Sequence, residues 1–193
     1  CLSGPFHEYP SLALGTIDAT LVEVAGMFNV FANSGVYAKP HYIRWIKDEW
    51  GTKIYKADVQ SVTVIDQKTV SQVAHVLTHG LNRVRKIFPN EWIVSDAISK
   101  TGTTNDSRTC WFVGATPDLT TAIYIGCDDN RPMGNNVYPL RTAFPIWRMF
   151  NRAVPSARKH FIFDSSLHEQ SIHDKSGELL VSPRDRNAMT ILV

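Results

Sequence analysis

Three strand-like segments close together in the sequence constrain the fold of this chain more than any other feature. They cover about residues 92–100, 108–115 and 121–127, and only short turns separate them. Connections this short join antiparallel neighbours, because a parallel pair needs a crossover of about a dozen residues or more. Helical patterns lie before and after this meander rather than between its strands. The sequence therefore predicts an α+β fold and not an alternating β/α one.

Two helices are predicted before the meander. The first runs from Thr20 to about Ala32 and starts with a capping box, Thr20-x-x-Glu23. Apolar residues cover most of its circumference, so we expect it to be buried on nearly all sides. The second helix spans about residues 69–85, and a similar pair, Thr69-x-x-Gln72, is expected to cap its start.

Shorter elements complete the pattern. A strand at residues 41–47 is expected to turn back and pair with residues 53–56. A third helix is predicted from residue 146 to about residue 153, between Pro145 and Pro155. The remaining residues are polar and lack periodicity, with one hairpin expected near residues 175–177.

A polar run ends the first strand of the meander, and its members are candidate site residues: Lys100, Thr101, Gly102, Thr103 and Thr104. Strand alternation places Lys100 and Gly102 on one face and Thr101 and Thr103 on the other. Because Gly102 has no side chain, an extended peptide can approach and pair with this strand edge. Lys100 then offers positive charge to a carboxylate, and the threonine hydroxyls offer donors to the same group. The N–H of Thr103 could stabilise an oxyanion. The run alone also fits a polar strand end that leads into a turn.

Charge and hydropathy exclude several function classes. The net charge is +2, which is too small to indicate binding to nucleic acid or to an anionic membrane. The basic run at residues 83–86 fits the solvated end of a helix. No apolar stretch reaches ~18 residues, so the sequence predicts no membrane-spanning segment.

Cysteines and histidines do not indicate a metal site. Cys110 and Cys127 lie on neighbouring strands and are nearly opposite if the turn at residues 117–118 is tight. A disulfide would then be within reach, but a shift of one residue would separate the side chains, and two buried free thiols are favoured. His75 and His79 are four residues apart on a helix but lack the Glu that zinc hydrolases place after the first His. We expect a hydrogen-bonded or solvated pair, and neither a metal nor a cofactor.

Motifs between residues 11 and 151 occur in a consistent order. They are Ser11-Leu-Ala-Leu-Gly15, Thr20-Leu-Val-Glu-Val-Ala25, Phe31-Ala-Asn-Ser-Gly-Val36, Ser99-Lys-Thr-Gly-Thr-Thr-Asn-Asp106, Trp111-Phe-Val-Gly-Ala-Thr-Pro-Asp118, Thr121-Ala-Ile-Tyr-Ile-Gly126, Asp128-Asp129-Asn-Arg-Pro132 and Pro145-Ile-Trp147. Together they resemble the transpeptidase domain of class A penicillin-binding proteins. Lys-Thr-Gly is one of three motifs of the serine acyltransferases that react with penicillin, and the other two are Ser-x-x-Lys and Ser-x-Asn.

The resemblance implies a penicillin-binding transpeptidase (serine β-lactamase-like) fold, with a five-stranded antiparallel sheet flanked by helices. The Lys-Thr-Gly strand would form one wall of the active-site cleft. By that match Lys100 and Thr103 are catalytic, and they contact the substrate together with Thr101, Gly102 and Thr104. In this family a serine attacks the D-Ala-D-Ala bond of a peptidoglycan stem peptide, and an amine of a neighbouring stem takes the acyl group. β-Lactams trap the acyl-enzyme. The family also implies a location outside the cytoplasm, in the periplasm or on the outer face of the cell membrane.

The two other family motifs do not occur before Lys100. We therefore expect residues 1–155 to be the C-terminal portion of the domain and residues 156–193 to be a tail. Such a chain would be inactive alone, because its serine would lie in a missing N-terminal part of a membrane-anchored parent. The sequence Ser156-Ala-Arg-Lys159 matches Ser-x-x-Lys but follows Lys-Thr-Gly, so we do not expect it to supply the nucleophile.

A second hypothesis is a catalytically incomplete module. It would bind a peptide or a protein partner through the exposed Lys-Thr-Gly strand. Both hypotheses predict exposed apolar surface, because half a domain leaves part of its core uncovered.

Overall fold

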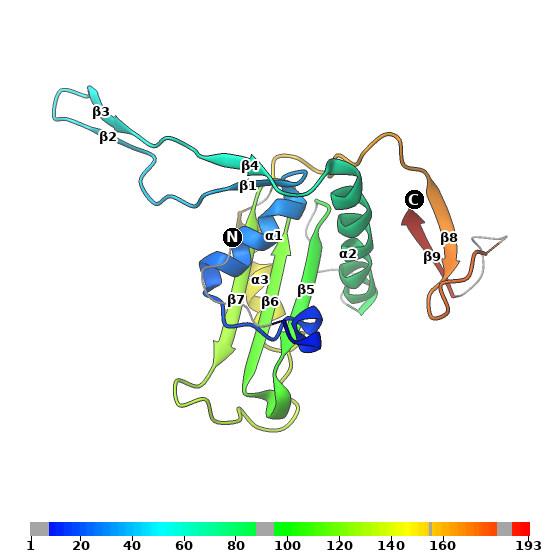
Figure 1. Ribbon diagram of the computed structural model, residues 1–193. Helices are drawn as coiled ribbons and strands as arrows, with labels where there is room; N and C mark the ends of the chain where they lie inside the picture. Colours follow the sequence, from blue (N-terminus) through cyan, green and yellow to red (C-terminus); the bar gives the residue numbers. More distant parts are fainter. Residues whose placement is uncertain (1–7, 88–94, 155, 181–186) are drawn as a thin grey trace.

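The computed structural model describes residues 8–87, 95–154, 156–180 and 187–193, and Figure 1 shows their arrangement. The elements in chain order are η1 (Pro10–Leu14), α1 (Leu21–Ala32), β1 (Val36–Ala38), β2 (Trp45–Lys47), β3 (Lys53–Lys56), β4 (Ser61–Thr63), α2 (Gln67–Ile87), β5 (Ile98–Thr103), η3 (Asn105–Ser107), β6 (Thr109–Ala115), β7 (Thr120–Gly126), α3 (Ala143–Ala153), β8 (Glu169–His173) and β9 (Ala188–Leu192). The α+β class is confirmed.

The central sheet is the predicted antiparallel meander, with strand order β5-β6-β7. Its first strand begins at Ile98 and continues to Thr103, so the predicted range of about 92–100 was wrong; residues 92–94 lie outside the described residues. β6 ends at Ala115, which pairs with Ile98. Residues 95–97 therefore have no residue of β6 opposite them. Asp96 instead donates its backbone N–H to the carbonyl of Lys159 at 2.7 Å. Three strands form this sheet within the described residues, compared with the five that the resemblance implies.

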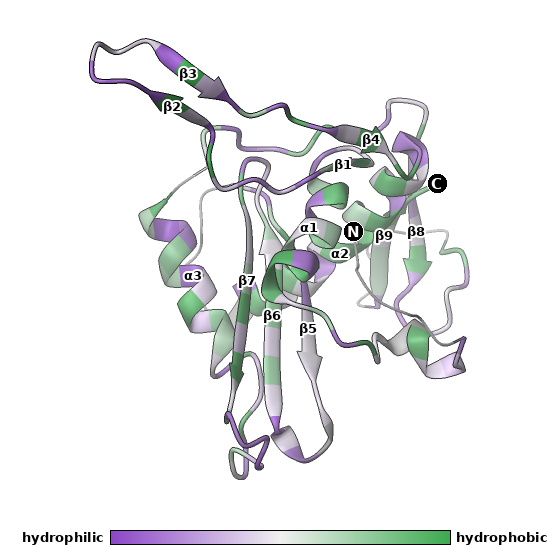
Figure 2. Ribbon diagram, turned by 60° about the vertical axis from the view of Figure 1, so that its left-hand side comes forward, coloured by the Kyte–Doolittle hydropathy of each residue, from purple (hydrophilic) through white to green (hydrophobic). Residues whose placement is uncertain are grey.

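Side-chain alternation along β6 builds a core on each face of the sheet. Phe112 faces α3 and packs against Phe144 and Trp147, with ring centroids 5.3 Å away in both cases. Val113 faces the opposite side, in a cluster with Phe28 of α1 and residues of α2 and β5. Figure 2 shows α3 on one side of the sheet and α1 on the other. α2 lies beside β5 and contributes to both cores, with Leu81 and Val84 in the first cluster and Ala74 in the second.

The predicted start of α1 is confirmed, but its predicted burial was wrong. The Thr20 hydroxyl accepts the N–H of Glu23, and the Glu23 carboxylate accepts the N–H of Thr20 at 2.8 Å. Only Phe28 and Val30 are buried, whereas Leu21 and Val22 are 44% and 42% exposed. The uncovered face borders an open groove of about 530 Å³ between α1 and the start of β7.

α2 begins two residues before its predicted start, and the expected cap at Thr69 was wrong. The carboxylate of Asp66 accepts the N–H of Thr69 at 2.9 Å, so Asp66 is the capping residue. These hydrogen bonds from Thr69 lower the pKa of the Asp66 carboxyl. Gly35 sets the entry to this helix, because its carbonyl accepts the N–H groups of Val64 and Ile65. A Cβ at Gly35 would lie 2.0 Å from the Ile65 oxygen, so only glycine fits there.

A long two-stranded arm projects from the body between α1 and α2 (Figure 1). Pairing of β1 with β4 forms its base, and pairing of β2 with β3 forms its outer part. The predicted hairpin is confirmed, but its first strand covers only Trp45–Lys47 and not all of residues 41–47. β1 and β4 were not predicted.

The C-terminal elements extend the predicted pattern. α3 begins at Ala143, so Pro145 lies within its first turn, where a missing N–H costs no helical bond. The predicted hairpin turn is present, with the N–H of Gly177 donated to the carbonyl of His173 at 2.9 Å. β8 also pairs with β9, which was not predicted. None of the helices in the described ranges is long and apolar enough to cross a membrane.

Gly114 provides a test of this packing. A Cβ added there would lie 2.8 Å from the indole ring of Trp147, whose Nε1 donates to the Gly114 carbonyl. We expect Gly114→Ala to reduce the free energy of unfolding by about 1–3 kcal/mol, measured by urea denaturation. Gly80→Ala is the matched control, because its Cβ would lie 3.8 Å from Ser99 and helix propensity favours alanine by up to about 1 kcal/mol. Equal unfolding midpoints for the two variants would contradict the packing described here.

Candidate functional site

The candidate site is the outer edge of β5, which is a border strand of the central sheet. α2 packs along the first part of this edge, where Gly80 faces Ser99 and Ser99 is buried. The next residues emerge from this cover: Lys100, Thr101 and Thr103 are exposed and Gly102 is half-buried. Residues 100–103 are therefore the last residues of β5 and lie at the surface, as predicted for a polar run at the end of this strand.

The register of β5 confirms how the predicted residues divide between the two faces. Lys100 is opposite Val113 and Gly102 is opposite Trp111, on the face that α1 covers higher up. Thr101 and Thr103 alternate to the other face, where Thr101 is opposite Phe112.

Backbone pairing directs a set of hydrogen-bonding groups outward. The N–H of Thr104 donates to the carbonyl of Thr109, which marks this as a hydrogen-bonded pair of the antiparallel ladder. Such pairs alternate along the strands, so Gly102 and Lys100 also bond towards β6. The N–H and C=O groups of Thr101 and Thr103 consequently point away from the sheet. An extended ligand at this edge meets donors and acceptors at alternate residues that the pairing with β6 does not use.

Side chains of the run differ in their availability. The Nζ of Lys100 donates to the carbonyl oxygen of Thr101 at 2.7 Å, so its charge is held beside the outward backbone groups. The Thr104 hydroxyl accepts the N–H of Thr109 at 2.9 Å and lies 3.2 Å from the Thr109 hydroxyl. Thr104 thus shapes the turn between β5 and β6.

Two aromatic residues near the run were not predicted as site residues. Trp111 and Tyr124 are directly opposite each other on β6 and β7, with ring centroids 4.9 Å apart. They share the face of Lys100 and Gly102, and a Cβ at Gly102 would lie 3.3 Å from the Trp111 Cβ. Trp111 lies opposite Gly102, and Tyr124 lies opposite Trp111. Both residues could have been predicted if the register of the three strands had been known.

Ser156 and Lys159 do not form a nucleophile and base. The Ser156 hydroxyl donates to the Asp118 carboxylate at 2.7 Å, and the Nζ of Lys159 donates to the Ser156 carbonyl at 2.9 Å. Arg158 also donates to Asp118 through its backbone N–H at 2.8 Å and through its guanidinium. These contacts fasten the chain after α3 to the turn between β6 and β7, and they hold the pKa of the Asp118 carboxyl well below its usual range.

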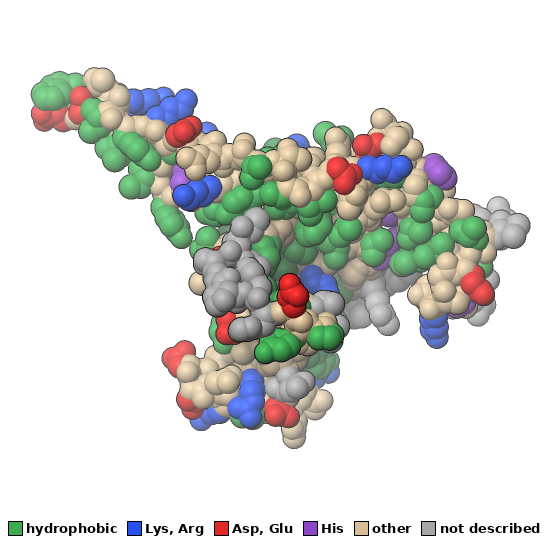
Figure 3. Space-filling model, in the orientation of Figure 1, with side chains coloured by type: hydrophobic (Ala, Val, Ile, Leu, Met, Phe, Trp, Pro, Cys, Tyr) green, Lys and Arg blue, Asp and Glu red, His purple; other side chains and the backbone are tan. Residues whose placement is uncertain are grey.

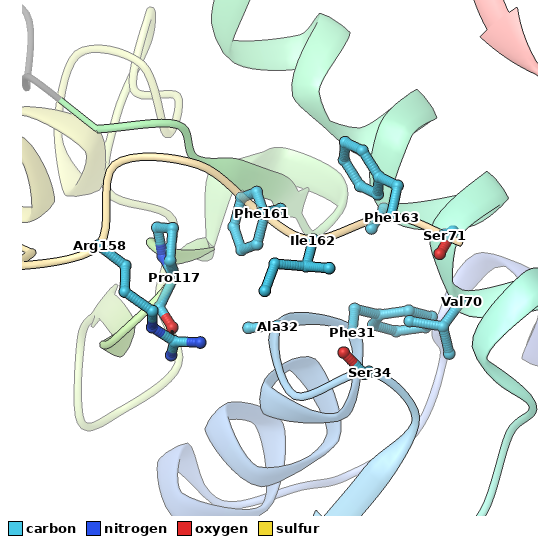
Figure 4. Close-up of a pocket in the computed structure, with 11 residues that line it drawn as sticks. Phe31, Ala32, Ser34, Val70, Ser71, Pro117, Arg158, Phe161, Ile162 and Phe163 are labelled. Carbon is cyan, nitrogen blue, oxygen red and sulfur yellow. Dashed lines mark hydrogen bonds between the residues drawn. The ribbon is translucent and has the colours of Figure 1, made fainter. Parts of the chain in front are cut away.

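The same C-terminal segment closes a small cavity, shown in Figure 4. Phe161 and Phe163 cover it from one side and Phe31 and Val70 from the other. Its volume of about 40 Å³ suits a water molecule and is too small for a substrate.

The expected hydrogen bond is present for His79 but not at the Nδ1 of His75, which is buried without a partner among the described residues, and the two cysteines are free thiols as predicted. The ring of His75 packs edge-on against His79 and Phe163, and burial lowers its pKa. The Nε2 of His79 lies 2.6 Å from the carbonyl oxygen of Thr190 in β9. Cys110 is buried, Cys127 is half-buried and both are free thiols. No cluster of metal-ligating side chains occurs among the described residues.

Sequence comparison places these features among known proteins. Residues 7–141 match the family described as the penicillin binding protein transpeptidase domain. Penicillin-binding protein 1A of Aquifex aeolicus is 32% identical over 150 residues, which cover 76% of this chain and 20% of that protein. Penicillin-binding protein 1A of Neisseria gonorrhoeae is 34% identical over 144 residues, which cover 71% and 18%. The chain therefore spans about a fifth of the length of these curated relatives.

Solved structures show the same fold. Penicillin-binding protein 1A of Haemophilus influenzae superimposes with a TM-score of 0.78 at 22% identity, over 97% of this chain and 34% of that one. PonA1 of Mycobacterium tuberculosis, in complex with penicillin V, superimposes with a TM-score of 0.68 at 20% identity, over 91% of this chain and 47% of that one.

The contacts at Asp118 predict a pH-dependent loss of stability. Because the folded carboxyl has a lowered pKa, its stabilising contribution is complete above the unfolded pKa of about 4 and declines as the pH falls below it. We expect Asp118→Asn to lower the urea midpoint at pH 7 and to differ less from the unmodified protein at pH 3. Asp129→Asn is the control, because its ion pair with Arg131 is highly exposed and contributes little. A constant difference between pH 7 and pH 3 would contradict this assignment.

Proposed function

The chain belongs to the penicillin-binding protein transpeptidase family, and we propose that its β5 edge forms one wall of a peptidoglycan D,D-transpeptidase active site. The observation that carries this proposal is the open Lys-Thr-Gly strand, with outward backbone groups at Thr101 and Thr103 beside the charge of Lys100. A peptidoglycan stem peptide would bind along this edge as an added strand. β-Lactams would bind there as mimics of that peptide, and PonA1, which has the same fold, was solved in complex with penicillin V.

The backbone supplies the catalytic part of this wall. A serine oxygen attacks the carbonyl carbon between the two D-Ala residues, and the carbonyl oxygen becomes an oxyanion. The outward N–H of Thr103 donates to that oxyanion, and preorganised donors of this kind stabilise acyl-transfer transition states. Collapse of the intermediate breaks the peptide bond, the terminal D-Ala leaves as the amine, and an acyl-serine ester remains. An amine of a neighbouring stem then attacks the ester and restores the serine hydroxyl.

Lys100 has a positioning role in this scheme. The stem peptide ends in a carboxylate, and the Nζ of Lys100 is exposed and held by a single backbone carbonyl. A carboxylate ligand would replace that carbonyl as the partner and form a charge-assisted hydrogen bond. The hydroxyls of Thr101 and Thr103 are short donors on the same strand edge.

The serine is proposed to lie outside this chain. Two features of the described surface could receive the part that carries the serine. Leu21 and Val22 on α1 are exposed, and a groove of about 530 Å³ is lined by α1, residues 38–41 and the start of β7. The relatives are about five times longer than the matched region, which leaves ample chain for such a part. We propose that it packs into this groove, in an enzyme that works outside the cytoplasm.

A second function is a peptide-binding module without catalysis. The same strand edge supports it, because β-augmentation requires only the outward backbone groups. The two functions differ in covalent chemistry, which mass spectrometry can detect.

Incubation with a penicillin tests the proposal. We expect no acyl adduct on this chain alone and one adduct on the complete enzyme, at a serine outside residues 1–193, by intact mass and peptide mapping. In that enzyme Lys100→Ala should slow acylation about 10²-fold, because the carboxylate loses its positioning charge. Lys175→Ala, at an exposed turn, and Ser156→Ala should acylate at the unmodified rate. An adduct on Ser156, or equal rates for Lys100→Ala and Lys175→Ala, would refute the assignment. An enzyme that binds stem peptide without any adduct would support the binding module.

A further inference from the structure

The arm formed by β2 and β3 exposes aromatic residues that a protein normally covers. Tyr42 is 89% exposed, Trp50 is 80% exposed and Trp45 is 48% exposed. All residues of β2 and β3 are exposed, so the arm has no support from the body. An isolated two-stranded hairpin is only marginally stable in water. Exposed apolar surface of this extent marks an interaction site.

The register gives one side of the arm a definite composition, and we call it the Trp–Lys face: Trp45, Lys47, Lys53 and Lys56. Trp45 is opposite Lys56, and Lys47 is opposite Lys53 beyond a shift of the register between Ile46 and Lys47. The Nζ of Lys47 lies 5.1 Å from the centre of the Trp45 ring, which confirms that the two share a face. The opposite face carries the pair Ile46 and Tyr55. Figure 3 shows hydrophobic side chains at the tip and along the lower margin of the arm, basic side chains on its upper margin, and acidic side chains at the tip and near the basic group.

This arrangement of lysines is unfavourable for the hairpin itself. Like charges directly across a strand pair destabilise it, and Lys47 and Lys53 occupy such positions. Within the described residues no carboxylate lies within ion-pair distance of Lys47, Lys53 or Lys56. Asp48, which adjoins Lys47 in sequence, accepts the N–H groups of Trp50 and Thr52 and so stabilises the turn. A bound anion would neutralise this repulsion.

We propose that the Trp–Lys face binds an anionic glycan strand, namely peptidoglycan that carries carboxylated stem peptides. This proposal rests on the proposed function, because the polymer assigned to the arm is the substrate that is proposed for the β5 edge. The flat, apolar faces of sugar rings pack against exposed aromatic rings such as Trp45. The stem-peptide carboxylates pair with the lysines through charge-assisted hydrogen bonds. The arm would hold the polymer while the β5 edge engages one of its peptides.

Other occupants fit the face less well. A second copy would place lysines against lysines. Insertion into an anionic bilayer would bring Glu49, exposed at the tip beside Trp50, into the negatively charged headgroups. The extended shape of the arm suits a linear polymer, and its charge suits one with carboxylates (Figure 1).

Co-sedimentation of the protein with purified insoluble peptidoglycan tests the proposal. We expect Lys53→Glu and Trp45→Ala each to weaken binding about tenfold or more, because each removes a charge-assisted or aromatic contact. Lys53→Glu also converts the repulsive pair with Lys47 into an attractive one, so lost binding cannot be ascribed to an unfolded arm. Lys175→Glu, which makes the same charge change at an exposed turn of the tail, should bind as the unmodified protein does.

Several outcomes would overturn the proposal. The first is that the protein does not bind peptidoglycan. The second is that Lys53→Glu and Lys175→Glu bind peptidoglycan equally well. The third is that the arm binds vesicles of phosphatidylglycerol but not peptidoglycan. Sedimentation equilibrium could instead give twice the mass of one chain for the unmodified protein and the mass of one chain for Lys53→Glu. That result would assign the face to a second copy of the chain.

Acylation by a penicillin separates this proposal from the proposed function. We expect Lys53→Glu to leave the acylation rate of the complete enzyme unchanged. A complete enzyme that binds peptidoglycan through the arm but forms no acyl adduct would retain this inference and lose the transpeptidase assignment.

Discussion

β6 is the strand on which the rest of the structure depends. It pairs with β5 on one side and with β7 on the other, and its alternating side chains contribute to both cores. Phe112 anchors α3 through Trp147, and Val113 belongs to the cluster that holds α1. Because the register of β6 is fixed by burial on both faces, the position of every residue of β5 is fixed with it. The geometry of the candidate site is therefore a consequence of core packing.

The exposure of the β5 edge to a ligand has a cause separate from the register of β6. α2 runs beside β5 and covers its edge at Ser99, through the close approach that Gly80 allows. From Lys100 onward the edge is uncovered, so outward backbone groups remain available to a ligand. Edge strands are normally blocked against pairing with other chains. An edge with outward backbone groups is what peptide recognition by strand addition requires.

Local signals predicted a large part of the fold. The meander, the capping box at Thr20 and the turn before Gly177 depend on neighbouring residues, and all three are present. The start of α2 was wrong because Asp66 and Thr69 can both cap a helix, and the choice between them is not local. Pairing of β1 with β4, and the bonds of Val64 and Ile65 to Gly35, bring the chain to the helix at Asp66. The burial of α1 was overestimated because an apolar helix surface does not specify what covers it.

The sequence by itself determined the α+β class, the Lys-Thr-Gly run and the family resemblance, because each is written in local order and spacing. Only the tertiary structure decided that the run lies within an edge strand, that Thr101 and Thr103 point their backbone groups outward, and that Trp111 and Tyr124 share the face of Lys100. It also decided that Lys47 and Lys53 oppose each other on the arm. The physical reason is the same in each case: strand register and edge exposure arise from contacts between segments distant in sequence, and side-chain periodicity alone leaves them undetermined.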